Sequence, residues 1–146
     1  MTTRLLTLSD YAQAAALLAH LSDGDPVADA KQFAGLLDHP GTSVFGTFVN
    51  ETLACTVTLH ILPNMTRAGR PYALIENVVT QPAMRGLGYA NTTMHAATES
   101  AWAKNAYKIM LLTGQDTGAR GFYEKLGFRA DQKFGMQLRR LPPRRP

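Results

Sequence analysis

The sequence predicts an α/β fold of the α+β kind, built as one mixed sheet with helices on both faces. Two observations support this fold class. The apolar patterns follow the order strand, helix, helix, strand, strand, strand, helix, strand, helix, strand. The length of 146 residues suits one hydrophobic core. Since no repeat or linker interrupts the order, we expect a single domain over residues 1–138 and a basic, mobile tail over residues 139–146.

The elements of the first half follow from periodicity and turn signals. Strands are predicted over residues 3–7, 43–49 and 53–61, and helices from Ser9 or Asp10 to about residue 22 and over residues 28–37. Asn50-Glu51 predicts a tight turn. The strand at 53–61 alternates clearly, so one apolar face is expected to carry Leu53, Cys55, Val57, Leu59 and Ile61.

The second half is predicted around a central strand at residues 72–80, which is apolar on both faces. A long helix follows over 88–104, with Ala90, Met94, Ala97 and Ala101 as its packing stripe. We then expect a buried strand at 108–113, a helix capped by Asp116 or Thr117 and ended by Gly127, and a last strand at 134–139.

The net charge of +4 is concentrated near the C-terminus. The last eight residues hold four arginines and no acid, which leaves eleven basic and eleven acidic residues in the rest of the chain. A solvated tail is favoured over nucleic-acid binding. Residues 52–146 hold thirteen bases and five acids, a balance that suits a polyanionic ligand or arises by chance.

Cysteine usage and hydropathy predict a cytoplasmic protein without a membrane partner. Cys55 is the sole cysteine, so an internal disulfide is excluded and a reducing compartment is the default. No apolar run approaches the roughly 20 residues that a membrane span needs. Cys55 lies in the apolar row of its strand, so we expect an inert core thiol.

A glycine-rich turn at Arg85-Gly-Leu-Gly-Tyr-Ala90 lies between the central strand and the long helix. A helix start presents N–H groups without intrahelical partners, and its dipole favours anions. Gly86 and Gly88 remove side chains that would block close approach, so this turn can surround a phosphate. The dinucleotide pattern Gly-X-Gly-X-X-Gly fails because its third position is Asn91.

Two motifs together resemble the GCN5-related N-acetyltransferases (GNAT). Arg85, Gly88 and Ala90 match the family signature Arg/Gln-X-X-Gly-X-Gly/Ala, and Tyr123-Glu-Lys-Leu-Gly-Phe128 matches a late family helix. The resemblance covers residues 3–138 and implies a mostly antiparallel sheet. It also implies an enzyme that moves an acetyl group from acetyl-CoA to a primary amine of a small molecule or peptide. The attack is direct, in a ternary complex, and no metal takes part.

The resemblance also implies roles for particular residues. Backbone groups of Val78, Val79 and Thr80 would pair with the pantetheine arm. The N–H groups from Arg85 to Ala90, through Gly86, Leu87, Gly88 and Tyr89, would hold the pyrophosphate. Tyr123 would protonate the departing thiolate, although helical spacing alone fits a core aromatic. Val78 N–H would hold the oxyanion. Asp116 stands where family members often have Asn, so its contact with the pantetheine arm is in doubt.

Acceptor-side residues are less defined. Glu76 is the first candidate base, acting through water, and His60 is the second. Arg67 and Arg70 either bind an anionic group or face solvent, and the Asp23-Gly-Asp25 turn either attracts a cationic amine or is an ordinary turn. The segment Ile75-Glu-Asn-Val-Val79 is similar to the corresponding sequence in the glucosamine-6-phosphate acetyltransferase branch. That branch is dimeric, so we expect a homodimer.

Two other functions fit the same sequence. One is a non-catalytic acyl-CoA-binding or regulatory module that has kept the fold but has no enzymatic activity. The other is an interaction protein whose arginine tail binds an acidic partner. Fold alone does not decide among these functions.

Overall fold

The computed structural model describes residues 1–22 and 24–141, so Asp23 of the predicted acidic turn and residues 142–146 of the basic tail lie outside the described residues. The chain forms two compact units, Met1–Met110 and Leu111–Pro146.

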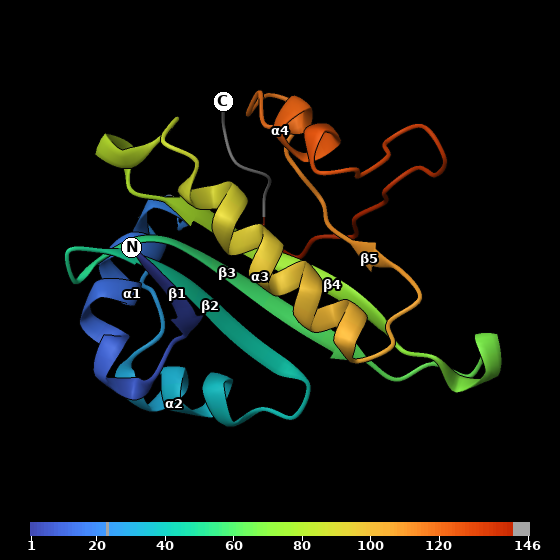
Figure 1. The fold of residues 1–146 in the computed structure, drawn as a ribbon, viewed down its shortest axis with the longest axis horizontal. Helices are drawn as coiled ribbons and strands as arrows, with labels where there is room; N and C mark the ends of the chain where they lie inside the picture. Colours follow the sequence, from blue (N-terminus) through green and yellow to red (C-terminus); the bar gives the residue numbers. More distant parts are fainter. Residues whose placement is uncertain (23, 142–146) are drawn as a thin grey trace. The chain divides into compact units, whose positions relative to one another are not determined.

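The first unit contains a five-stranded sheet in the order β1-β2-β3-β4-β5 (Figure 1). Its strands are β1 Thr2–Leu5, β2 Thr42–Val49, β3 Thr52–Leu62, β4 Tyr72–Thr80 and β5 Ile109–Met110. Neighbouring strands run antiparallel except β4 and β5, which are parallel. The predicted mixed, mostly antiparallel sheet is confirmed. Strand β4 pairs antiparallel with β3 on one side and parallel with β5 on the other.

Helices cover both faces of this sheet, as predicted. They are α1 Tyr11–Leu18, α2 Ala30–Asp38 and α3 Tyr89–Ala103, with single 3-10 turns η1 Leu8–Asp10, η2 Ala19–Leu21, η3 Arg67–Gly69 and η4 Pro82–Met84. On one face Thr47 of β2 hydrogen-bonds Thr93 of α3, at 2.7 Å. The other face packs against α1 and α2 in one apolar cluster of Leu6, Ala14, Leu17, Phe33, Val44, Phe48, Leu53 and Val79. Figure 1 shows α3 crossing in front of β3 and β4.

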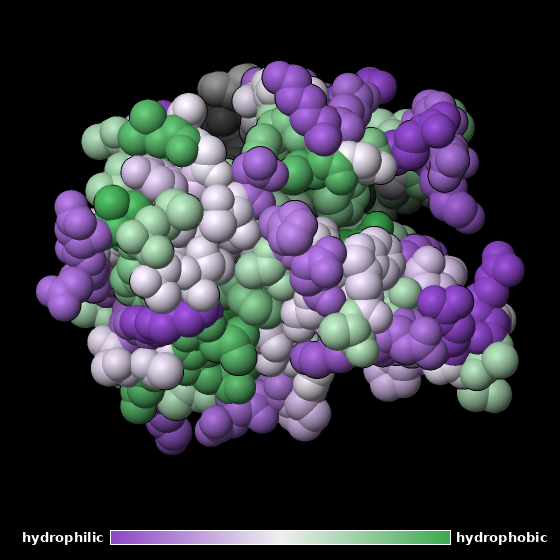
Figure 2. All heavy atoms as spheres, in the orientation of Figure 1, coloured by the Kyte–Doolittle hydropathy of each residue, from purple (hydrophilic) through white to green (hydrophobic). Residues whose placement is uncertain are grey.

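Hydrophilic side chains gather along the outward side of α3 (Figure 2). Asn91, His95 and Glu99 are exposed there, whereas Met94, Ala97 and Ala101 are buried against the sheet. The predicted stripe is therefore correct except that Thr93 is also buried and Ala90 is half-buried. None of the described helices combines the length and the hydropathy that a membrane crossing requires.

The starts of α1 and α2 depend on acidic side chains. Asp29 precedes α2 and exchanges hydrogen bonds with Gln32, so the helix begins two residues later than predicted. Asp10 precedes α1, but its carboxylate accepts the Thr7 N–H at 2.8 Å and two Arg4 hydrogen bonds, at 2.7 and 2.8 Å. The bonds from Arg4 are the main cause that lowers the pKa of Asp10 to about 2.

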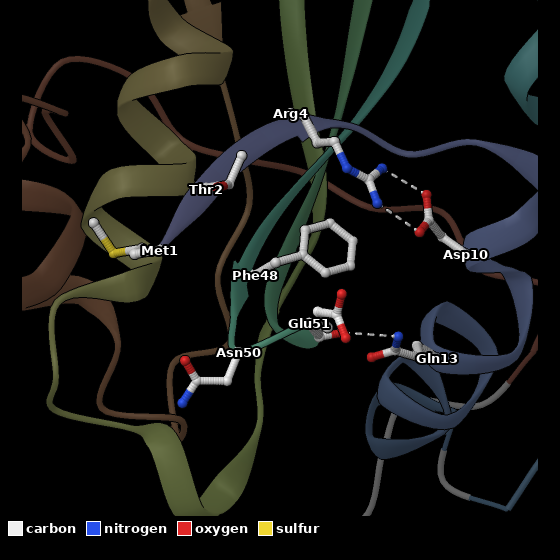
Figure 3. A pocket seen from close by; sticks show the side chains of 8 residues that line it. All are labelled: Met1, Thr2, Arg4, Asp10, Gln13, Phe48, Asn50 and Glu51. Atoms are coloured by element: carbon white, nitrogen blue, oxygen red, sulfur yellow. Dashed lines mark hydrogen bonds and ion pairs between the residues drawn. The ribbon is translucent and has the colours of Figure 1, made fainter.

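The Arg4–Asp10 pair lines a shallow pocket beside β1 (Figure 3). The Arg4 guanidinium also lies 4.1 Å from the centroid of the Phe48 ring. Because β1 is the outer strand of the sheet, away from β4 and β5, this pocket is separate from the glycine-rich turn predicted to hold phosphate. Arg4 is paired with Asp10, and the Gln13 amide donates to the Glu51 carbonyl at 3.1 Å, which favours a structural role.

A bulge changes the predicted apolar row of β3. Thr47 pairs with Cys55 but Phe48 pairs with Leu53, so Ala54 is an extra residue on β3. Leu53 consequently joins the apolar cluster beside α1 and α2, while Cys55 lies on the face of Thr47. The prediction of one face from Leu53 to Ile61 is wrong at Leu53. The alternate residues Thr56 and Thr58 are buried as well, because helices cover both faces.

The second unit contains α4, Arg120–Lys125. Gly127, with φ 91°, ends this helix as predicted, and the Phe128 N–H donates to the Tyr123 carbonyl at 3.1 Å. The predicted start is wrong, because Ala119 precedes the helix and neither Asp116 nor Thr117 caps it. The Thr117 hydroxyl instead donates to the Gly114 carbonyl, at 2.9 Å.

Two predicted strands are also corrected. The strand expected at 108–113 is reduced to Ile109–Met110, and its end is not buried, since Met110 is 37% exposed. Residues 134–139 form no strand. Phe134, Met136 and Leu138 keep the alternating pattern but are almost fully exposed. The predicted strand is therefore wrong, because none of the described strands pairs with these residues.

Candidate functional site

The candidate site begins with a bulge in β4. Thr58 pairs with Glu76 and Thr56 pairs with Val79, so Asn77 and Val78 together lie opposite Val57. Asn77 has φ 53°, a left-handed conformation that Asn tolerates better than most residues. The bulge adds one residue to β4 and thereby shifts which backbone groups point to which neighbouring strand.

Beyond the bulge, one edge of β4 is open. The β5 register includes only Ala73 and Leu74, and no described strand pairs with the later residues on that side. The Gln81 N–H donates to Ala54 of β3, at 2.8 Å. Alternation along the strand therefore directs Val79 toward β3 and directs the backbone groups of Val78 and Thr80 to the open edge. An extended ligand could pair with these two residues as a strand would.

The glycine-rich turn follows directly, between η4 and α3. Gly86 and Gly88 have φ 77° and 86°, and nothing lies within 4 Å of the position that a Cβ atom would take at either residue. The N–H groups of Gly86, Leu87 and Gly88 donate to no partner among the described residues. The first N–H groups of α3 add further donors. This arrangement can accept a phosphate group, and Arg85 beside it is exposed.

A buried set of hydroxyl groups positions the start of α3, and sequence reasoning missed it. Thr93 donates to the Tyr89 carbonyl at 2.8 Å and bonds Thr47 of β2, which bonds Thr3 of β1. Thr93 is fully buried, so these bonds fix the first turn of α3 against the sheet. No local sequence pattern marked Thr93, because its partner Thr47 lies 46 residues away in the chain.

Glu76 and His60 lie on the same face of the sheet, the face of α1 and α2. Glu76 pairs with Thr58, and His60 pairs with Leu74 one step further along β3. The Glu76 carboxylate is exposed and forms no ion pair with a described residue. The His60 ring is half-buried, and its Nδ1 bonds the Thr42 hydroxyl at 2.9 Å. Glu76 is therefore the freer of the two candidate bases.

Cys55 is an inert core thiol, as predicted. It is fully buried, and burial raises the pKa of the thiol. A raised pKa keeps the sulfur protonated and weakly nucleophilic. Both properties argue against Cys55 as an acyl carrier.

Tyr123 and Asp116 belong to the second unit. Tyr123 is half-buried on α4, with its ring edge-on to Phe122 and Phe128 at centroid distances of 5.1 and 6.1 Å. These contacts fix the direction of the Tyr123 ring. Asp116 is exposed in the segment before α4. The roles expected for both residues stay predictions.

Comparison with known proteins identifies the family of this chain. Residues 8–128 match the acetyltransferase (GNAT) family. The chain is a member of the GNAT acetyltransferase family. The resemblance expected from Arg85, Gly88 and Tyr123 is thereby confirmed, and the open edge of β4 and the turn before α3 lie within the matched residues.

Individual relatives cover nearly the whole GNAT chain. A glucosamine 6-phosphate N-acetyltransferase of Trypanosoma brucei brucei is 33% identical over 138 residues, 89% of this chain and 90% of the relative. The structure of a protein from Agrobacterium tumefaciens str. C58 has a TM-score of 0.90 at 41% identity, covering 96% of this chain and 100% of that one. A Trypanosoma brucei acetyltransferase structure has a TM-score of 0.81 at 30% identity, covering 94% and 98%.

Proposed function

We propose that this GNAT protein transfers an acetyl group from acetyl-CoA to a primary amine of a small molecule or peptide. The observation that carries the proposal is that unpaired backbone groups follow one another along the chain, from the open edge of β4 to the start of α3. Val78 and Thr80 offer unpaired backbone groups, and the N–H groups from Gly86 to Ala90 offer an anion site. An extended arm that ends in a pyrophosphate fits this order of donors.

The proposed reaction is a direct attack of the amine on the thioester carbonyl. Glu76 takes the amine proton through a water molecule, and Val78 N–H donates to the oxygen that becomes negative. The carbon–sulfur bond breaks, and Tyr123 gives its proton to the thiolate. A phenol with a pKa of about 10 can protonate a thiolate whose acid has a pKa of about 8.5. Leu87 and Tyr89 flank the phosphate site. A contact of Asp116 with the pantetheine arm is part of the same proposal.

The relative that acts on glucosamine 6-phosphate supports an amine acceptor of small size. The alternative is a non-catalytic acyl-CoA-binding or regulatory module. The exposed, unpaired Glu76 favours the enzyme, because a carboxylate with no structural partner is available for proton transfer.

Several wider features are part of the same proposal. We infer one catalytic domain over residues 1–138 followed by a basic tail, in a cytoplasmic protein that binds neither membrane nor nucleic acid. The single, buried and protonated thiol of Cys55 suits a reducing compartment. The exposed apolar side chains of Phe134, Met136 and Leu138 support a homodimer.

The test compares coenzyme binding with turnover in Tyr123→Phe and Glu76→Gln. Tyr123→Phe keeps the ring contacts and removes the proton donor. We expect each variant to bind acetyl-CoA with unchanged affinity by calorimetry, while kcat/KM in a thiol-release assay falls about 100-fold. Glu99→Gln, an exposed carboxylate on the outward side of α3, is the matched control and should retain full rate.

Other outcomes separate the alternatives. Coenzyme binding by the wild type with no thiol release for any amine would favour the binding module. If Glu76→Gln keeps its rate and His60→Asn loses it, His60 is the base. Failure of the wild type to bind acetyl-CoA would contradict the proposal at its first step.

A further inference from the structure

A cluster of positive and aromatic side chains lies where β4 and β5 begin. The Tyr107 N–H donates to the Pro71 carbonyl and the Ala73 N–H donates to the Lys108 carbonyl, both at 2.9 Å. The Arg70 guanidinium donates to the carbonyls of Asn105 and Ala106, at 3.3 and 3.4 Å. The segments around residues 70 and 107 are therefore fixed to each other, and the Arg70 guanidinium contributes to this by its hydrogen bonds to the second segment.

Lys108 is held in this cluster without a negative partner. Its ammonium lies 5.5 Å from the Tyr72 ring centroid and 5.4 Å from that of Tyr107. The Arg67 guanidinium lies 5.8 Å from the same Tyr107 ring. Aromatic faces attract a cation and hold it in place but leave its charge uncompensated. Neither Lys108 nor Arg67 forms an ion pair with any carboxylate in the described part of the chain.

The cluster lies on the same sheet face as Glu76. Side chains of Tyr72, Leu74 and Glu76 alternate on one face of β4, and the register is continuous up to the bulge after Glu76. Lys108 contacts Tyr72 on that face, and Met110 pairs beside Leu74. Tyr72 and Glu76 are four residue steps apart, which separates their Cα atoms by about 13 Å. The side chains of Lys108 and Glu76 can shorten the distance between the two charges.

The face from Glu76 to Lys108 therefore has three parts. A free carboxylate lies at one end, half-buried Leu74 and exposed Met110 lie in the middle, and an uncompensated ammonium lies at the other end. An amine with an anionic group at the far end of a carbon skeleton has the complementary order of charges. A neutral amine would leave Lys108 unpaired.

We propose that Lys108, held between Tyr72 and Tyr107, binds the anionic group, phosphate or carboxylate, of an acceptor whose amine lies at Glu76. This inference rests on the proposed function and narrows its acceptor to primary amines that carry a negative group. Arg67, which lies near the same Tyr107 ring, adds positive potential to the same place. Tyr72 and Tyr107 are positioning residues for the ammonium.

The experiment uses a pair of amines that differ only in the anion. Thiol release from acetyl-CoA is measured with glucosamine 6-phosphate and with glucosamine, for the full-length wild type, Lys108→Gln and Lys104→Gln. Lys104 is an exposed lysine after α3 that contacts neither tyrosine, so it controls for overall charge. We expect the wild type to prefer the phosphorylated amine. Lys108→Gln should reduce that preference in kcat/KM at least tenfold, mainly through KM, and Lys104→Gln should keep it.

Direct binding separates this inference from the proposed function. Glucosamine 6-phosphate is titrated by calorimetry into each protein without coenzyme. One outcome is that the wild type binds glucosamine 6-phosphate without turnover and that Lys108→Gln weakens this binding. That result would support the anion site and contradict the transferase proposal. Turnover of both amines with no preference for phosphate, or a preference that survives in Lys108→Gln, would overturn the anion site and leave the transferase intact. If the wild type shows neither turnover nor binding of glucosamine 6-phosphate, the anion site is overturned as well.

Discussion

At the scale of single residues, Asn77 lies at the bulge that shapes the backbone of the candidate site. It is exposed, so its side chain contributes little packing, yet its φ of 53° sets the bulge that directs Val78 to the open edge of β4. A β-branched residue resists this conformation, whereas glycine adopts it freely. The residue type at this position therefore acts through backbone geometry and not through contacts.

We predict that Asn77→Val destabilises the protein by about 1–2 kcal/mol and weakens acetyl-CoA binding, while Asn77→Gly changes stability by less than about 1 kcal/mol. Urea unfolding measures the first effect and calorimetry the second. The two variants share the loss of the amide, so a difference between them reports the backbone alone. Equal behaviour of Val and Gly at this position would contradict the proposed role of the bulge.

Residue patterns predicted part of the site. Glu76, Gly86 and Gly88 were found because a strand, a glycine turn and a helix follow each other with a recognisable spacing. Asn77 and the buried Thr93 were missed. A bulge depends on the register between two strands, and a buried hydroxyl depends on a partner 46 residues away, so neither leaves a local pattern.

At the scale of elements, the starts and ends of the central strand and the long helix were predicted to within one residue, because β4 is apolar on both faces and α3 follows a glycine. The helix α4 and the strand β5 are shorter than predicted. Short elements with few buried residues gain little from periodicity, so their ends depend on tertiary contacts that sequence does not show.

The turn before α3 can be tested without disturbing its glycines. Leu87 is 62% exposed and its backbone is not in the left-handed region. Leu87→Glu places a negative charge beside the proposed pyrophosphate site, and Leu87→Gln is the neutral control of the same size. We expect Glu to weaken acetyl-CoA binding about tenfold, less so at high salt, because screening reduces the repulsion. Equal affinities of the two variants would place the phosphates elsewhere.

At the scale of the whole molecule, exposed apolar surface near the C-terminus requires an explanation. Phe134, Met136 and Leu138 are 99%, 91% and 104% exposed, and Leu112, near Gly135 in the same unit, is 52% exposed. Burial of each large side chain contributes about 1.5–3 kcal/mol, so covering three of them could hold two chains together. A second copy always offers the same alternating segment for this purpose.

We therefore predict that the wild type sediments at twice its chain mass of 15.9 kDa, and that replacing Phe134, Met136 and Leu138 together by Ser yields the single-chain mass. Met65→Ser removes an equally exposed apolar side chain, 95% exposed in the loop before η3, and should remain dimeric. Sedimentation equilibrium at micromolar concentration distinguishes these masses. A monomeric wild type would contradict the dimer. A dimeric triple variant would move the interface away from this segment, because hydrophobic association depends on the apolar area that the three serines remove.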